Sequence, residues 1–216
     1  MSPAGLFLSF EGGEGSGKSV QARALADWLR SNGREVVLTR EPGGTLFGER
    51  VREVLLHAKD VSLAPAAQAL LFSAARAQLV AEVIRPALAA GAVVVADRFF
   101  DSTLAYQGHG YGADLAGLMA ITRFATADLR PQRTFLLDVP VDVGSARRAA
   151  RRSGAHRWDR FESDGRQFHE RLRAGYLELA AADTARFVLV PGDRALEVIA
   201  AEIQGSVAEL LVPSRS

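Results

Sequence analysis

The apolar residues of this chain follow two alternating spacings. Short apolar runs, typical of strands buried on both faces of a sheet, are separated by longer stretches with helical spacing. Leu25, Trp28 and Leu29 show the helical spacing, and Gly33 ends that stretch. Pro86 is expected to break or kink a long helix that starts at residue 65. The expected strands are residues 6–10, 35–39, 92–96, 134–138 and 186–190. The other expected helices are a stretch from residue 18 and residues 47–57, 113–127, 141–152, 166–182 and 196–211.

This alternation of strands and helices predicts an α/β fold, in which helices cover both faces of a parallel sheet. The chain has 216 residues, enough for one domain with a full hydrophobic core. It shows neither internal repeats nor a low-complexity linker. We therefore expect a single domain, residues 1–216, with inserted flaps.

The composition narrows the classes of function. Hydrophobic residues make up 48% and charged residues 24%, and the net charge of +1 predicts no overall attraction to nucleic acid or to an anionic membrane. The chain has no cysteine, which excludes disulfides, thiolate metal sites and cysteine nucleophiles and fits a reducing cytoplasm. Residues 1–5 do not have the pattern of a signal peptide, and the apolar stretch 87–96 is too short to span a bilayer.

Residues 12–19 fit the phosphate-binding pattern G-x-x-x-x-G-K-[ST]. Glycines allow the positive φ angles that bring backbone N–H groups close to phosphate oxygens. Lys18 adds a positive charge near the outer phosphates, the Ser19 hydroxyl can ligate Mg2+, and the N-terminus of the following helix favours an anion. The expected nucleotide-binding residues are Gly12, Gly13, Glu14, Gly15, Ser16, Gly17, Lys18 and Ser19.

The same segment can also be a glycine-rich turn that binds no ligand. The preceding strand and the amphipathic helix that follows favour a P-loop instead. A GTPase is not indicated, because the sequence lacks the base-recognition motif N-K-x-D. A motor or transporter ATPase is not indicated either, because no apolar strand obviously ends in Asp-Glu.

A charged pair, Asp97 and Arg98, follows the buried strand at residues 92–96. In a parallel sheet, ligands bind beyond the carboxyl ends of the strands, so this pair is expected beside the P-loop. Asp97 can hold magnesium, mainly through water, and Arg98 can bridge the transferred and acceptor phosphates. The alternative is a structural ion pair at a strand end.

Three further segments carry groups suited to binding, each with a plainer interpretation. Residues 39–44 form a charged turn after the second strand, or simply a loop. Phe72 and Arg76 share one helix face, suited to stacking and hydrogen bonding with a base or to ordinary packing. Residues 101–107 offer groups that can recognise a pyrimidine edge, or they begin a helix capped by Asp101 or Ser102.

Six arginines and one acidic residue lie between positions 147 and 160, around Gly154. A basic loop broken by glycine after a helix is typical of a mobile lid, here about residues 147–162. Arginines in such a lid stabilise the charge that develops in phosphoryl transfer, and closing it excludes water. A solvated basic face or a nucleic-acid patch is the alternative.

Taken together, these segments resemble the bacterial thymidylate kinases over about residues 6–200. The P-loop is not specific to that family, whereas the Arg-Glu-Pro-Gly-Gly and Asp-Arg…Ala-Tyr-Gln-Gly segments together are. The resemblance implies a nucleoside monophosphate kinase fold with a five-stranded parallel sheet, a homodimer, dTMP and ATP as substrates, and Mg2+. The motifs that carry it are residues 10–12, 39–45, 71–76, 97–98, 106–108 and 159–162.

The resemblance also implies roles at the sugar and phosphate of dTMP. Glu14 would contact the deoxyribose 3′-hydroxyl. Glu41 and Arg52 would line the sugar–phosphate end, and Arg98 would hold the phosphate. Tyr106 would crowd the 2′ position and so disfavour ribonucleotides.

For the base, the resemblance implies that Phe72 stacks on thymine and that Arg76 bonds a base carbonyl. Thr103 and Gln107 would recognise the base edge, although the Ser102-Thr103 pair leaves open which hydroxyl faces it.

The catalytic arginine is expected in the lid. Some family members place an arginine in the P-loop at the position of Gly15, and this chain therefore resembles the type in which lid arginines act. Arg151 is the first candidate, followed by Arg147 and Arg160. The lid is longer and richer in arginine than the family pattern, so the choice among the three stays open.

The expected mechanism is direct in-line transfer of the γ-phosphate, with Lys18, Arg98 and a lid arginine neutralising the moving charge. Two other interpretations remain. One is a P-loop kinase for another nucleotide or nucleoside, which acceptor selectivity would reveal. The other is a nucleotide-binding regulatory or nucleic-acid protein, which would bind RNA or DNA in a salt-sensitive way.

Overall fold

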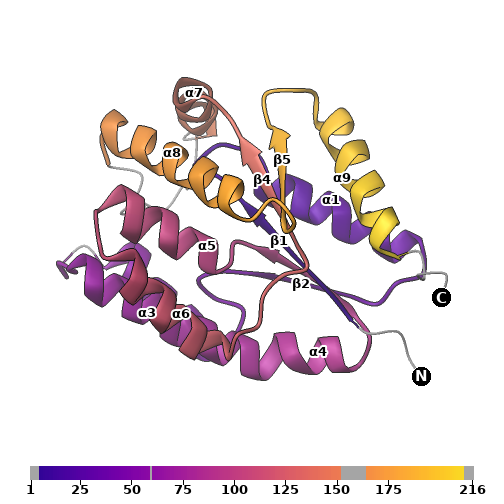
Figure 1. The fold of residues 1–216 in the computed structure, drawn as a ribbon, viewed down its shortest axis with the longest axis horizontal. Helices are drawn as coiled ribbons and strands as arrows, with labels where there is room; N and C mark the ends of the chain where they lie inside the picture. The colour runs from indigo at the N-terminus through magenta and orange to yellow at the C-terminus, as the bar shows by residue number, and fades with distance from the viewer. Residues whose placement is uncertain (1–4, 59, 152–163, 212–216) are drawn as a thin grey trace.

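A five-stranded parallel sheet forms the centre of the molecule (Figure 1). The structure, a computed structural model, describes residues 5–58, 60–151 and 164–211. The strand order is β2-β3-β1-β4-β5, and every neighbouring pair is parallel. The predicted fold class is thereby confirmed, and no strand end differs from its predicted position by more than one residue. The strands are β1 (Leu6–Glu11), β2 (Val36–Arg40), β3 (Val93–Asp97), β4 (Arg133–Asp138) and β5 (Phe187–Pro191).

Helices cover both faces of the sheet. On one face lie α1 (Lys18–Ser31) and α9 (Leu196–Leu211), and on the other lie α3 (Pro65–Leu79) and α6 (Leu115–Thr126). The π-helical turns are η1 (Glu53–His57), η2 (Val80–Ile84) and η3 (Leu104–Gly110). The remaining α-helices are α2 (Leu46–Arg52), α4 (Arg85–Ala89), α5 (Phe100–Thr103), α7 (Val141–Arg151) and α8 (Arg166–Ala182).

The apolar runs in the strands exist because both faces of the sheet are buried. In β1, Leu8 and Phe10 pack against α1 and α9, whereas Phe7 points to the opposite face and packs among residues of α3 and α6. All three side chains are fully buried. β1 and β3 are therefore buried along most of their length, and in a parallel sheet the loops beyond the carboxyl ends of the strands are where ligands bind.

Of the two outcomes expected at Pro86, a break or a kink, the break does not occur. The helical run continues from Pro65 to Ala89, and the π-helical turn η2 directly precedes α4, which begins at Arg85 with Pro86 in its first turn. Proline has no N–H to donate, and its ring clashes with the carbonyl four residues earlier. A π-turn, whose bonds run to the fifth residue, widens the helix at that point and accommodates the ring.

This run, Pro65–Ala89, is also long and apolar enough to cross a membrane by length and composition alone. Leu79, Val80 and Ile84 are instead packed in the core between the sheet and its helices. The same test is passed by core helices of proteins that never enter a membrane, so the run is weak support for a span.

Candidate active site

The loop between β1 and α1 has the backbone geometry of a phosphate cradle. Gly12, Gly15 and Gly17 all have positive φ angles, of 141°, 73° and 94°. Gly17 is the N-cap of α1, and the first turn of that helix contains no acidic residue, so its N–H groups remain suited to an anion. Lys18 is buried against the loop, where its Nζ donates to the Gly13 carbonyl at 3.1 Å.

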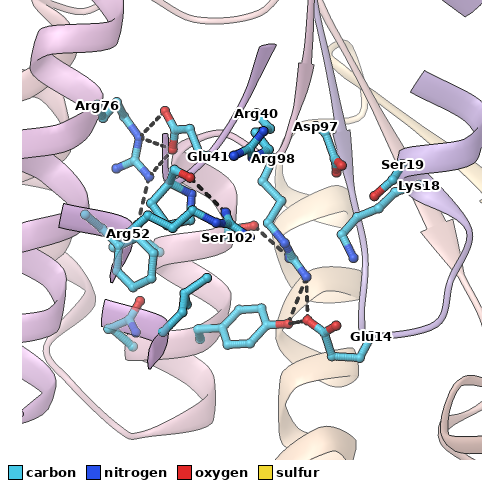
Figure 2. Close-up of a pocket in the computed structure, with 16 residues that line it drawn as sticks. Glu14, Lys18, Ser19, Arg40, Glu41, Arg52, Arg76, Asp97, Arg98 and Ser102 are labelled. Carbon is cyan, nitrogen blue, oxygen red and sulfur yellow. Dashed lines mark hydrogen bonds and ion pairs between the residues drawn. The ribbon is translucent and has the colours of Figure 1, made fainter. Parts of the chain in front are cut away.

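A cavity of about 200 Å³ opens beside this loop (Figure 2). Its wall brings together the predicted substrate and metal residues from four separate parts of the chain. It also includes Ser102, the alternative to Thr103 at the base edge, and three residues without an individual predicted role, Arg40, Pro42 and Leu56. Leu56 lies in η1 and has the spacing of a core residue, so the sequence offers no signal for it. The predicted residues on the wall are Glu14, Lys18, Ser19, Glu41, Arg52, Phe72, Arg76, Asp97, Arg98, Thr103, Tyr106 and Gln107.

Arg98 lies between the P-loop and the rest of the cavity. Its φ of 75° is left-handed, which is strained for a residue with a side chain, and its N–H donates to the Phe10 carbonyl at 2.9 Å. Its Nη2 donates to Glu14 Oε1 at 2.7 Å and to the Tyr106 hydroxyl at 3.1 Å. Such a fixed guanidinium suits a phosphate, for which planar arginine groups are the preferred protein donors.

Glu14 stays ionised in this setting. Burial by itself raises its pKa, but the charges of Lys18 and Arg98 and a hydrogen bond from Tyr106 outweigh burial and lower the pKa to about 2. The carboxylate can therefore accept a hydrogen bond from a ligand hydroxyl throughout the neutral range. Burial and the charge of Arg98 lower the pKa of Lys18, while Glu14 and Asp97 oppose that change.

Glu41 and Arg76 form a buried ion pair on the far wall of the cavity. Arg76 Nε and Nη2 both donate to the Glu41 carboxylate, at 2.9 and 2.6 Å, and Nη2 also donates to Thr103 Oγ1 at 3.0 Å. Glu41, Arg76 and Thr103 were each predicted to contact the ligand, but the sequence did not indicate that they also bond to one another. The buried Arg76 Nη1 has no hydrogen-bond partner among the described residues, so one donor remains for a ligand.

Gln107 and Ser102 differ in what they can offer. Gln107 donates through Nε2 to Gln68 at 3.1 Å, and its buried Oε1 has no hydrogen-bond partner in the described structure. Ser102 Oγ donates to the buried Glu11 carboxylate at 2.6 Å. Helix α5 begins after Phe99, which makes no side-chain cap, so Asp101 and Ser102 are not the helix caps considered from the sequence.

Ser19 and Asp97 are the two predicted magnesium ligands. Both line the cavity beside Lys18, and Asp97 Oδ1 is buried without a hydrogen-bond partner in the part of the chain described. The described residues contain no cluster of three or more His, Cys, Asp or Glu side chains suited to a metal. A hydroxyl and one carboxylate fit Mg2+, because this ion usually keeps several waters and binds one or two protein ligands together with substrate phosphates.

The three lid arginines have different outcomes. Arg147 Nη1 donates at 2.8 Å to the carbonyl of Gly192, so this side chain holds the loop that follows β5. Arg160 and the side chain of Arg151 lie outside the described residues, as does most of the predicted lid, 147–162. The choice of a catalytic arginine therefore stays a prediction.

The P-loop and α7 touch through their backbones at two glycines. A Cβ atom on Gly15 would lie 2.2 Å from the Gly144 carbonyl oxygen, and a Cβ atom on Gly144 would lie 2.5 Å from the Glu14 carbonyl oxygen. Real Cβ atoms essentially never approach so closely, and Gly15 also has a left-handed φ. No side chain at position 15 is compatible with α7 in its present place.

Comparison with known proteins gives one consistent answer. The family model described as "Thymidylate kinase" matches residues 10–203. The chain is 49% identical to a thymidylate kinase of Pseudomonas fluorescens (strain Pf0-1), over 98% of this chain and 99% of that protein. It is 47% identical to a thymidylate kinase of Roseiflexus sp. (strain RS-1), over 94% and 93%. Its structure resembles the crystal structure of thymidylate kinase from Ehrlichia chaffeensis, with a TM-score of 0.75, 32% identity and 95% and 99% coverage.

Proposed function

Since this chain belongs to the thymidylate kinase family of phosphotransferases, we propose that the cavity beside its P-loop binds dTMP and that the P-loop binds ATP with Mg2+. The feature that carries the proposal is the shared wall of the cavity. Glu14, Lys18 and Ser19 of the P-loop border the same space as Phe72 and Gln107. A nucleotide bound there would have its phosphate beside the P-loop and its base near α3 and η3.

The proposed reaction is direct in-line transfer. An oxygen of the dTMP phosphate, already ionised, attacks the γ-phosphorus of ATP, and ADP leaves, so no general base and no covalent enzyme intermediate are required. Lys18, Arg98 and a lid arginine, of which Arg151 is the first candidate, would neutralise the moving charge. Ser19, and Asp97 through water, would hold Mg2+, which would supply positive charge beside the ATP phosphates.

The base pocket offers donors and acceptors suited to thymine. The free Nη1 of Arg76 would donate to a base carbonyl, the free Oε1 of Gln107 would accept the base N–H, and Phe72 would stack on the ring. Tyr106, which donates to Glu14 at 2.8 Å, would border the deoxyribose 2′ position. These roles favour dTMP over purine and cytosine nucleotides, whose base edges carry a different arrangement of hydrogen-bond donors and acceptors.

The first expected result is acceptor selectivity. ADP release from ATP and Mg2+ should be strongly stimulated by dTMP, more weakly by dUMP, and little by dCMP, AMP or thymidine. A coupled ADP assay with each acceptor at the same concentration measures it. No stimulation by dTMP would leave nucleotide binding at the P-loop in place but discard the thymidylate assignment, and salt-sensitive RNA or DNA binding without ADP production would favour a nucleic-acid role.

We further propose that the protein acts as a homodimer. Its location would be the cytoplasm, a reducing compartment that its lack of cysteine fits. Large apolar side chains are exposed on three helices that pack side by side, α2, α3 and α6. Leu46 is 80% exposed, Leu70 is 56% exposed and Phe124 is 91% exposed. Exposed apolar side chains on neighbouring helices are suited to a protein–protein interface.

A charge within that surface should separate the subunits. Leu70→Glu is expected to convert the dimer into monomers, because the carboxylate would be buried without a partner. Size-exclusion chromatography with light scattering measures the mass. Val198→Glu on α9, a 52% exposed position on the other face of the sheet, is the matched control and should remain dimeric. A Leu70→Glu protein that stays dimeric would place the interface elsewhere.

A further inference from the structure

Glu11 is a buried carboxylate with no role in the mechanism above. It is the last residue of β1, and its side chain is fully buried. Its Oε1 accepts the backbone N–H groups of Phe99 at 2.8 Å and Ser102 at 3.3 Å. Its Oε2 accepts the hydroxyls of Ser102 at 2.6 Å and Tyr176 at 3.0 Å. All four neighbours act as donors, which suits an ionised carboxylate.

The two hydroxyls that donate to Glu11 also contact Arg98. Arg98 Nη1 lies 3.0 Å from Ser102 Oγ and 3.1 Å from the Tyr176 hydroxyl. Arginine can only donate, and each hydroxyl has a single proton. When Glu11 accepts a hydrogen bond from each hydroxyl, the lone pairs of both hydroxyl oxygens remain available to Arg98. The two hydroxyls also lie 3.0 Å from each other, a contact in which either can donate. By accepting both hydroxyl protons, the carboxylate directs them away from each other and leaves both oxygens as acceptors for Arg98.

We propose that Glu11 is a positioning residue for phosphoryl transfer, which orients the hydroxyls of Ser102 and Tyr176 so that both accept from Arg98. Glu14 and Tyr106 hold the Nη2 side of the same guanidinium. Glu11 would hold the Nη1 side indirectly, through two successive hydrogen bonds by way of a hydroxyl. This inference rests on the proposed function, in which Arg98 binds the acceptor phosphate.

The charges around Glu11 show why its ionised form depends on this arrangement. Burial and the nearby Asp101 raise the pKa of Glu11 to about 7, while Arg98 and the donors from Ser102 and Phe99 oppose the rise. Lys18 also faces it, and Asp101 is itself paired with Arg186. A protonated Glu11 or a glutamine would offer a donor to the hydroxyls, and a hydroxyl that accepts that donor loses a lone pair for Arg98.

The test is a mutant cycle that combines Glu11→Gln with the paired substitution Ser102→Ala/Tyr176→Phe. Glu11→Gln is expected to lower kcat/KM for dTMP about 10- to 100-fold, the range for a hydrogen bond to a charged group, with KM for ATP changed less than about twofold. In the Ser102→Ala/Tyr176→Phe background, the same substitution should cost less than about threefold, because the groups through which Glu11 acts are gone.

Asp101→Asn provides the matched control. Asp101 is a buried carboxylate next to Ser102 on α5, and it pairs with Arg186 rather than with Arg98. Its substitution should lower the melting temperature and leave KM for dTMP within about twofold while the protein is folded. A loss of kcat/KM for dTMP in Asp101→Asn as large as that of Glu11→Gln would show that any loss of buried charge in this region lowers activity, and would overturn the positioning role.

Additive effects of Glu11→Gln and the hydroxyl variants would also overturn it. Should Glu11→Gln fail to fold, the Ser102→Ala/Tyr176→Phe protein decides, because it must itself lose about tenfold or more in kcat/KM for dTMP with an unchanged KM for ATP. Wild-type protein that is not stimulated by dTMP would instead refute the proposed function. A stimulated wild type with an additive cycle would refute only the role of Glu11.

Discussion

Replacement of Lys18 by alanine is expected to lower kcat about a thousandfold or more while the Kd for dTMP changes less than about threefold. The ammonium lies in the phosphate cradle, 3.1 Å from the Gly13 carbonyl, and would follow the charge that develops on the transferred phosphoryl group. The proposed base-binding residues Phe72, Arg76 and Gln107, by contrast, come from α3 and η3. Removal of the lysine therefore acts on the transition state far more than on the bound acceptor.

Two measurements separate these effects. Steady-state kinetics gives kcat, and calorimetric titration of the ATP-free enzyme gives the Kd for dTMP. Arg30→Ala, at an exposed position in the last turn of α1, is the matched control and should retain kcat within about twofold. Equal losses of turnover and of dTMP binding in Lys18→Ala would contradict this division of roles between the P-loop and the acceptor pocket.

Removal of Glu41 should have the largest effect on stability. Glu41→Ala is expected to lower the free energy of unfolding by about 3–5 kcal/mol, because it leaves the guanidinium of Arg76 buried without its counter-charge. The side chains of Arg76 and Glu41 are only 1% and 5% exposed, so water cannot replace the lost partner. Denaturant titration measures the loss, and KM for dTMP should rise as Arg76 loses its orientation.

A surface pair and a double variant complete this test. Asp27→Ala breaks an ion pair with Arg30 in which the side chains are 75% and 46% exposed, and it should cost less than about 1 kcal/mol. Glu41→Leu combined with Arg76→Met should recover much of the stability but not the dTMP affinity, since apolar replacements remove both charges together. A Glu41→Ala protein as stable as Asp27→Ala would show that the buried pair does not stabilise the fold.

The strands could be predicted from the sequence because burial on both faces of the sheet leaves a simple signature. The π-helical turns could not, since their apolar residues have nearly the spacing of an ordinary helix. This is why Pro86 was expected to end or kink a helix that in fact continues through η2. The widened turn depends on how the carbonyls before the proline are arranged, and residue types alone do not express that.

In the candidate site too, some features could be predicted from local sequence patterns and others could not. Segments such as 39–44 and 71–76 indicated a binding role, but no local pattern connects Glu41 with Arg76, which are 35 positions apart. Tyr176 lies on α8, 74 positions from Ser102, and has no motif of its own. Glu11 did carry a signal, because an acidic residue at the end of a buried strand requires partners. Their identity follows only from the folded structure.

The contact between Gly15 and Gly144 has a consequence for how this enzyme can change over evolutionary time. An arginine introduced at position 15 would collide with the backbone of α7, which leads into the lid. If the catalytic arginine is in the lid, as we propose, a single substitution at position 15 would not transfer its role to the P-loop while α7 keeps its present place. The first turn of α7 would have to move as well, so the two ways of supplying that charge are separated by a barrier of epistasis rather than by one mutational step.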